Sequence, residues 1–311
     1  MNRKKLVGAL LMLFTAIIWG GSFVAQSSGG NAIGPFSFSC LRFTIATVAM
    51  LPVIALLDKK NNSAMIPKSS ADKKLLFRAG ITCGVFLTGT SVLQQLGMFM
   101  GTSSGKAGFL TACYIAFVPV ISLFFKKTPQ LNVWLSVVIT LCGLYLLCVN
   151  EGFSVHLSDL LVLICAFMCA SRIMAVDRFV NRVDTARLAC VQFATAAVLS
   201  GILMFFFDMH ASAEGITEWG KSLASTGLWV SLLYAGVLAG AVAFTLQIVG
   251  QRDLNPTVAS LLMSLESAFS VLAGWLILGD RLSAKELLGC AVIFAALVIS
   301  QLPNRKKLKH R

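Results

Sequence analysis

Charged residues are scarce in this chain. Asp, Glu, Lys and Arg together make up 13% of its 311 residues, which is about half of the roughly 25% that soluble domains carry. Hydrophobic residues make up 57%. A soluble protein of this composition would have to bury nearly all of its side chains, so the composition predicts an integral membrane protein.

Histidine is scarce, and nothing in the sequence supports catalysis. The three histidines, His156, His210 and His310, lie outside the apolar runs. No paired-histidine, P-loop or nucleophile-elbow motif occurs. The sequence therefore predicts neither an enzyme nor an ATP-driven pump, and no cofactor or metal. Because all nine cysteines lie inside apolar runs, we expect packed free thiols rather than disulfides.

The apolar runs divide into ten segments of about the 20 residues that a helix needs to cross a bilayer. The first is interpreted as a membrane helix rather than a cleaved leader, because further spans follow it. The first turn is expected at residues 27–31 and at Gly34-Pro35. We thus predict an all-α integral membrane protein with ten transmembrane helices. The predicted spans are 6–26, 36–57, 76–97, 107–125, 131–149, 157–176, 188–207, 226–250, 257–278 and 286–302.

Basic residues outnumber acidic ones and give a net charge of +13. They are spread over short loops, and the sequence contains no basic domain that could hold a nucleic acid. Twenty of the 26 Lys and Arg residues fall on the side of the N-terminus, four fall on the other side, and Arg42 and Arg172 lie within spans. Because basic loops stay in the cytoplasm, this bias predicts cytoplasmic termini and supports an even number of spans.

The two halves of the chain resemble each other. A shift of 150 residues aligns Cys40 with Cys190 and Phe43 with Phe193, and the pattern of five spans repeats. Residues 1–150 and 151–311 are therefore predicted to form two five-helix repeats. Because five is odd, the second repeat crosses the membrane in the opposite sense. Inverted repeats are common in secondary transporters, with the site near the midplane. The alternative is a duplicated membrane scaffold or sensor that transports nothing.

A single carboxyl, that of Glu266, lies near the middle of the ninth span. A charge at that depth costs roughly 2.5–3.5 kcal/mol even on the more lenient scale, so we expect the group to be used or paired. Two roles are open. Without a cation beside it, the carboxyl could exchange protons and couple transport to a proton gradient. Beside Arg42 or Arg172 it would stay ionised, as a lock or as a ligand for a substrate ammonium.

Arginines and uncharged polar groups within the spans are the other candidates. Arg172 is expected to extend towards the cytoplasmic face rather than to bind a substrate. Arg42, near the outer end of the second span, could meet a substrate carboxylate or phosphate. Side chains that could either bond to a neighbouring helix or line a cavity are Trp19, Gln94, Tyr114 and Tyr234.

Several segments resemble one transporter family in the right order. Residues 16–23, AIIWGGSF, resemble the opening helix of EamA-type members of the drug/metabolite transporter superfamily. Residues 38–43 resemble the second helix, 108–119 the fourth, and 265–282 the ninth and its end. The chain departs from the family pattern at Ser267 and Asp280, where proline and glutamate are usual.

The resemblance implies ten helices in two inverted five-helix repeats, cytoplasmic termini and a bacterial inner membrane. It also implies a central cavity faced by Trp19, Gln94, Tyr114, Tyr234 and Glu266. The family exports amino acids, metabolites or toxic compounds, either uncoupled or linked to protons. We therefore predict a secondary exporter of small amino-acid-like or amphipathic metabolites that works by alternating access in the lipid bilayer. An exchanger or importer of the same fold is the alternative.

Overall fold

Helices make up the secondary structure of the chain wherever it is described. The computed structural model describes residues 3–59, 66–102, 104–126, 128–148, 156–273 and 283–301, and these ranges contain no strand. The predicted all-α class is confirmed. The elements are α1 (Arg3–Gly20), α2 (Ser22–Ile33), α3 (Pro35–Lys59), α4 (Ser70–Phe99), α5 (Ser104–Ala112), α6 (Tyr114–Phe124), α7 (Leu131–Cys148), α8 (Leu157–Phe179), α9 (Thr185–Leu203), the π-helical η1 (Met204–Asp208), α10 (Ala213–Ser222), α11 (Thr226–Leu233), the π-helical η2 (Tyr234–Phe244), α12 (Thr245–Gln251), α13 (Pro256–Met263), α14 (Leu265–Ala273) and α15 (Ala284–Gln301).

Many of these helices are suited to a bilayer. Within the described ranges, six are long and apolar enough to cross it: Pro35–Lys59, Ser70–Phe99, Lys106–Phe124, Leu157–Phe179, Thr185–Asp208 and Thr226–Gln251. Two shorter apolar helices cover Leu131–Leu146 and Leu287–Ile299. Large apolar side chains such as Phe14, Leu56 and Val138 are exposed on the outside, where a soluble monomer would not gather them. The chain is a multi-pass membrane protein.

Part of the predicted organisation falls on residues outside the described ranges. The ends of the predicted spans 131–149, 257–278 and 286–302 lie there, as does the predicted boundary between residues 150 and 151. Asp280 and His310 also lie there.

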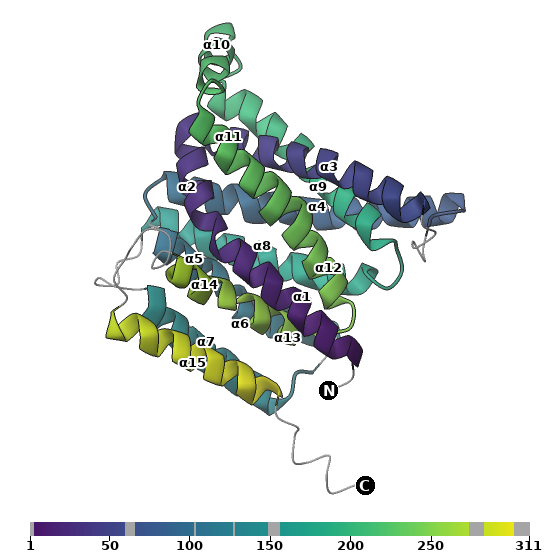
Figure 1. Cartoon of the computed structure of the whole chain (residues 1–311), viewed down its shortest axis with the longest axis vertical. Coiled ribbons are helices and arrows are strands. Elements are labelled where there is room, and N and C mark those ends of the chain that lie inside the picture. Colours follow the sequence, from purple (N-terminus) through teal and green to yellow (C-terminus); the bar gives the residue numbers. More distant parts are fainter. Residues whose placement is uncertain are drawn as a thin grey trace, which may run out of the picture.

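The two halves of the chain interleave rather than lie apart. α4 packs along α8 and α9, and α3 packs along α9. α1 runs against η2, α12, α13 and α14, while α7 and α15 form a pair at one edge of the bundle (Figure 1). α10 projects from one end (Figure 1). The largest helix contacts therefore join an element of the first half to an element of the second.

Three helices of the bundle are interrupted by a single residue. α1 and α2 meet at Gly21, α5 and α6 meet at Cys113, and α13 and α14 meet at Ser264. Such breaks free backbone polar groups, which membrane proteins tolerate only where the backbone is buried in protein or lines a cavity. The backbone at these breaks is therefore expected to be buried between the helices or to line a cavity there.

The first turn falls at Gly34, the later of the two positions where the sequence predicts it. A break at residues 27–31 is wrong, because α2 stays helical through Gly29 and Gly30 to Ile33. Gly34 turns the chain with a φ of +93°, which glycine adopts without strain. The glycines of α2 make room for neighbours instead, since a Cβ at Gly29 would collide with the ring of Phe38.

Gly84 lets α4 approach α9, and Gly84→Ala is expected to destabilise the fold. The added methyl would lie 2.5 Å from Cβ of Thr195 and 3.0 Å from the backbone oxygen of Gln192. Overpacking of this kind costs about 1–3 kcal/mol, so the thermal unfolding midpoint in detergent should fall. Gly220→Ala, whose Cβ would meet no atom within 4 Å, is the control and should not lower it. Equal midpoints for the two variants would contradict the close approach.

Candidate functional site

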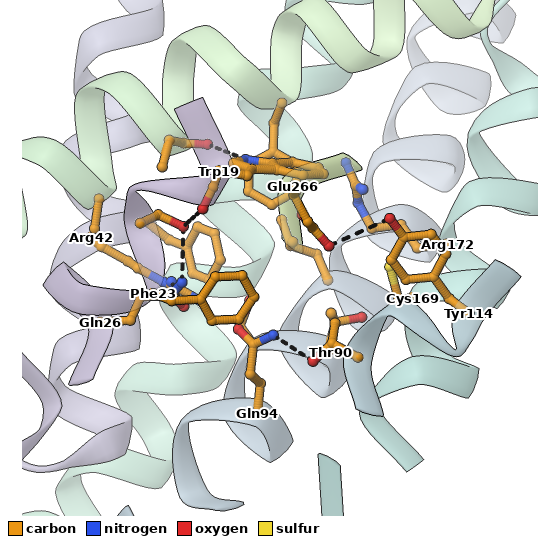
Figure 2. A pocket seen from close by; sticks show the side chains of 18 residues that line it. Trp19, Phe23, Gln26, Arg42, Thr90, Gln94, Tyr114, Cys169, Arg172 and Glu266 are labelled. Atoms are coloured by element: carbon orange, nitrogen blue, oxygen red, sulfur yellow. Dashed lines mark hydrogen bonds between the residues drawn. The ribbon is translucent and has the colours of Figure 1, made fainter. Parts of the chain in front are cut away.

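A buried cavity of about 70 Å³ lies among the interrupted helices (Figure 2). Elements from both halves of the chain contribute to its wall, including α1, α4, α8 and α14. The volume is well below the roughly 300–1,000 Å³ of ligand pockets, and a water needs only about 10–15 Å³ of it. A metabolite would therefore require the walls to move apart. Six of the seven predicted site residues line the cavity: Trp19, Arg42, Gln94, Tyr114, Arg172 and Glu266.

Tyr234, the seventh, is not among the residues that line this cavity. Its hydroxyl donates to the backbone oxygen of Ile18 at 2.8 Å. It also occupies the space beside Gly21, where a Cβ would lie 2.5 Å from the hydroxyl oxygen. The Tyr234 hydroxyl is satisfied by this backbone acceptor. Tyr234 therefore links η2 to the joint between α1 and α2.

Arg42 is held on one side of the cavity by an amide and an aromatic ring. Its Nη1 donates to Oε1 of Gln26 at 2.6 Å, and its Cζ lies 4.8 Å from the centroid of the Phe43 ring. A desolvated cation–π contact contributes about 2 kcal/mol. Nε of Arg42 has no hydrogen-bond partner in the described part of the chain.

Arg172 stays in the core, only 1% exposed, so the expected extension towards the cytoplasmic face is wrong. Its Nη1 donates to Oε1 of Gln247 at 2.8 Å, and its Cζ lies 4.5 Å from the centroid of the Phe244 ring. These two partners hold the guanidinium inside the bundle. Its Nε and Nη2 are left without a hydrogen-bond partner among the residues described.

Glu266 lies in the first turn of α14, just after the break at Ser264, and is 4% exposed. Its Oε1 accepts a hydrogen bond from the Tyr114 hydroxyl at 3.4 Å (Figure 2), which is longer than the usual range of about 2.5–3.0 Å. No ion pair joins Glu266 to either arginine within the described ranges. Arg42 and Arg172 are held by Gln26 and Gln247 instead.

Polar residues that sequence reasoning missed complete the wall. Gln26 donates through Nε2 to Oγ of Ser22 at 3.2 Å, and Gln94 donates through Nε2 to Oγ1 of Thr111 at 2.9 Å. Ser22 and Gln26 are four residues apart, as a shared helix face requires. Ser22 in turn follows Trp19 by three residues. These intervals are the sequence signal that could have identified Ser22 and Gln26.

Aromatic rings connect the two arginines. The ring centroids of Phe43 and Phe193 are 6.2 Å apart, those of Phe193 and Phe244 are 5.9 Å apart, and those of Trp19 and Phe244 are 4.7 Å apart. Trp19 also donates through Nε1 to the backbone oxygen of Ala239 at 3.0 Å. This row of rings fixes the wall on which both guanidinium groups rest.

The cavity wall carries side chains of both positive and negative charge. In Figure 2, Arg42 and Arg172 stand on opposite sides of the cavity, and the Glu266 carboxyl lies between them. A ligand with one anionic and one cationic group would find donors and an acceptor here. The described residues contain no group of three His, Cys, Asp or Glu side chains that could hold a metal ion, and eight described cysteines are free thiols.

Comparison with known proteins agrees with a transporter. The chain is similar to an uncharacterized transporter of Archaeoglobus fulgidus, 26% identical over 96% of this chain and 87% of that protein. It is also similar to the threonine/homoserine exporter RhtA of Escherichia coli (strain K12), 27% identical over 68% of this chain and 72% of that protein. A solved crystal structure that is 18% identical matches with a TM-score of 0.76 over 96% of this chain and 97% of its own. At that identity the match shows the fold alone.

The sequence profile of one family covers nearly the whole chain. The EamA-like transporter family matches residues 6–149 and again residues 156–301. Its members are transporters, so the prediction that the chain is not an enzyme is confirmed, as is the predicted family resemblance. This protein belongs to the EamA-like transporter family.

Proposed function

We propose that this protein exports small zwitterionic metabolites, amino acids in particular, by alternating access. The proposal rests on charged side chains in the cavity wall that lack partners within the described ranges. Among the described residues, Nε and Nη2 of Arg172 have no hydrogen-bond partner, and Glu266 has no cation partner. Buried ions without partners are costly, so a ligand that supplies both opposite charges would be stabilised here. An α-amino acid is the smallest common metabolite of that kind.

Arg172 suits the carboxylate of such a ligand, and Glu266 suits its ammonium. Nε and Nη2 form one edge of a guanidinium, and that edge can bind both oxygens of a carboxylate through parallel hydrogen bonds. Arg42, on the opposite side, also has a fully buried donor nitrogen without a partner in the described part of the chain, Nε. The Gln94–Thr111 pair offers further partners for a ligand hydroxyl. The relative named a threonine/homoserine exporter supports hydroxylated amino acids as the first class to test.

The packing is best explained by ten transmembrane helices in two inverted five-helix repeats, residues 1–150 and 151–311. The two matches to the family profile support the division. The contacts are also reciprocal, as a pseudo-twofold axis in the membrane plane would produce. Packing of α4 on α8 corresponds to packing of η2 and α12 on α1, and packing of α5 and α6 on α8 corresponds to packing of α13 and α14 on α1.

We place the protein in a bacterial inner membrane with both termini in the cytoplasm, and the distribution of charge supports this orientation. Twenty of the 26 basic residues fall on the side of the N-terminus, and basic loops are retained in the cytoplasm. On the side proposed to be external, Lys106 of α5 contacts Asp159 of α8, with Nζ and Oδ2 2.6 Å apart. Thr102 donates to the same carboxylate at 3.0 Å. Both contacts join the first half of the chain to the second.

Counterflow in proteoliposomes tests the proposed function. Vesicles loaded with unlabelled threonine should take up labelled threonine. The corresponding amine without the carboxyl, and the hydroxy acid without the ammonium, should compete at least about tenfold less well, since each leaves one buried charge unpaired. Glu214→Gln, an exposed change in α10, should behave as the wild type. Absence of counterflow for all zwitterions, or equal competition by the amine, would contradict the proposal. A strict need for internal counter-substrate would identify an exchanger.

A further inference from the structure

A second and larger cavity lies on the outside of the bundle, separate from the transport cavity. We call it the basic groove. It has a volume of about 550 Å³ and is lined by one face of α4, one face of α8 and the end of α6. On α4, Arg78, Thr82 and Phe86 follow one another at intervals of four residues, so they lie on one face. The groove therefore runs roughly 12 Å along α4, from a basic end to an apolar end.

Three arginines gather at the basic end. Arg78 comes from α4, Arg178 comes from the last turn of α8, and Arg182 follows α8. Their guanidinium groups form no hydrogen bond or ion pair with the residues described. None of the described residues that line the groove is acidic. Positive charge therefore accumulates here on the side proposed to be cytoplasmic.

The apolar part of the groove opens onto surface that faces lipid. Its walls include Phe86, Ile121 and Met174. Beside it, the outward-facing side chains Ile81 of α4 and Leu123 of α6 are 49% and 47% exposed. A dissolved anion would find only the arginines attractive, whereas a molecule with a phosphate and a hydrocarbon chain would match both ends.

We propose that the basic groove binds an anionic phospholipid of the cytoplasmic leaflet. The phosphodiester accepts hydrogen bonds from Arg78, Arg178 and Arg182, and one acyl chain lies along Phe86 and Met174. The volume is within the roughly 300–1,000 Å³ of well-formed ligand sites. Basic pockets between membrane helices are known to hold such headgroups. The bound lipid would join α4 to α8, which belong to different halves of the chain.

Titration of the purified full-length protein in detergent with phosphatidylglycerol tests the proposal, with native mass spectrometry to count bound lipid. Each basic residue near an anionic headgroup contributes about a factor of five in affinity, so the triple variant Arg78→Gln/Arg178→Gln/Arg182→Gln should bind about a hundredfold more weakly. Lys4→Gln/Lys68→Gln/Lys73→Gln removes the same charge from exposed positions outside the groove and should bind as the wild type does. Equal losses in the two triple variants would overturn the proposal.

A second variant tests the apolar end. Ser171 lines the groove from α8, and Ser171→Phe would fill the space for the acyl chain while leaving the arginines in place. It should bind phosphatidylglycerol at least about tenfold more weakly. Inorganic phosphate and glycerophosphoglycerol should not displace the lipid. Full lipid binding by Ser171→Phe, displacement by the soluble anions, or displacement by threonine would overturn the lipid assignment. None of these measurements depends on transport.

Discussion

Replacing Glu266 with glutamine is expected to abolish the response of transport to a proton gradient. Downhill exchange of substrate should persist at saturating concentration, with weaker binding because the substrate ammonium loses its counter-charge. An amide cannot release and rebind a proton, but its oxygen can still accept the hydrogen bond from Tyr114. With one proton exchanged per substrate, each pH unit supports about tenfold accumulation in the wild type. The variant should show none. The measurement is accumulation of labelled threonine in proteoliposomes at imposed pH differences of zero, one and two units.

The prediction rests on the surroundings of the carboxyl. Glu266 lines a cavity, and the two arginines that could have locked it are held by Gln26 and Gln247. Glu218→Gln, an exposed change in α10, is the matched control and should keep the wild-type response. The neutral amide costs less to bury than a carboxylate, so Glu266→Gln should remain folded. Loss of folding would assign Glu266 a structural role. An unchanged response to the pH difference would contradict proton coupling through Glu266.

The sequence predicted the class of fold and most of the candidate site because a bilayer leaves few alternatives. Without water in the membrane, the backbone must bond within helices or closed barrels, so hydropathy reveals the segments. For the same reason a single carboxyl such as Glu266 stands out within an apolar run. The same argument found Arg42 and Arg172, which are the charged lining residues besides Glu266.

Hydropathy along the chain does not reveal which side chains on other helices will contact these charged groups. Arg172 was expected to reach for the cytoplasmic face because depth was judged along its own helix, whereas Phe244 and Gln247 come from elements more than 70 residues away. The helix joints were missed for a related reason. Cys113 and Ser264 interrupt helices as single residues without a local turn signal, while the Ser- and Gly-rich segment 27–31 has that signal and remains helical.

Arg172→Lys is expected to weaken binding of carboxylate substrates by about ten- to a hundredfold while keeping the positive charge. Lysine cannot present two parallel N–H donors, and it cannot stack flat on Phe244 while bonding to Gln247. Hydrogen bonds to charged groups contribute about 1.5–3 kcal/mol each, which corresponds to this loss. The measurement is the half-saturating concentration of threonine in counterflow.

A comparison of threonine with its carboxamide separates recognition from a general defect. The wild type should prefer the acid by about ten- to a hundredfold, because the carboxamide offers one oxygen and no charge to the guanidinium. Arg172→Lys should lower this ratio clearly, because the ammonium still attracts the carboxylate but cannot bind both of its oxygens in parallel. A merely destabilised protein would keep the wild-type ratio. Arg252→Lys, at an exposed arginine that donates to Asn181 at 3.2 Å, should keep the full preference. If Arg172→Lys keeps it and Arg42→Lys loses it, the carboxylate binds on the opposite side of the cavity and the assignment to Arg172 is wrong.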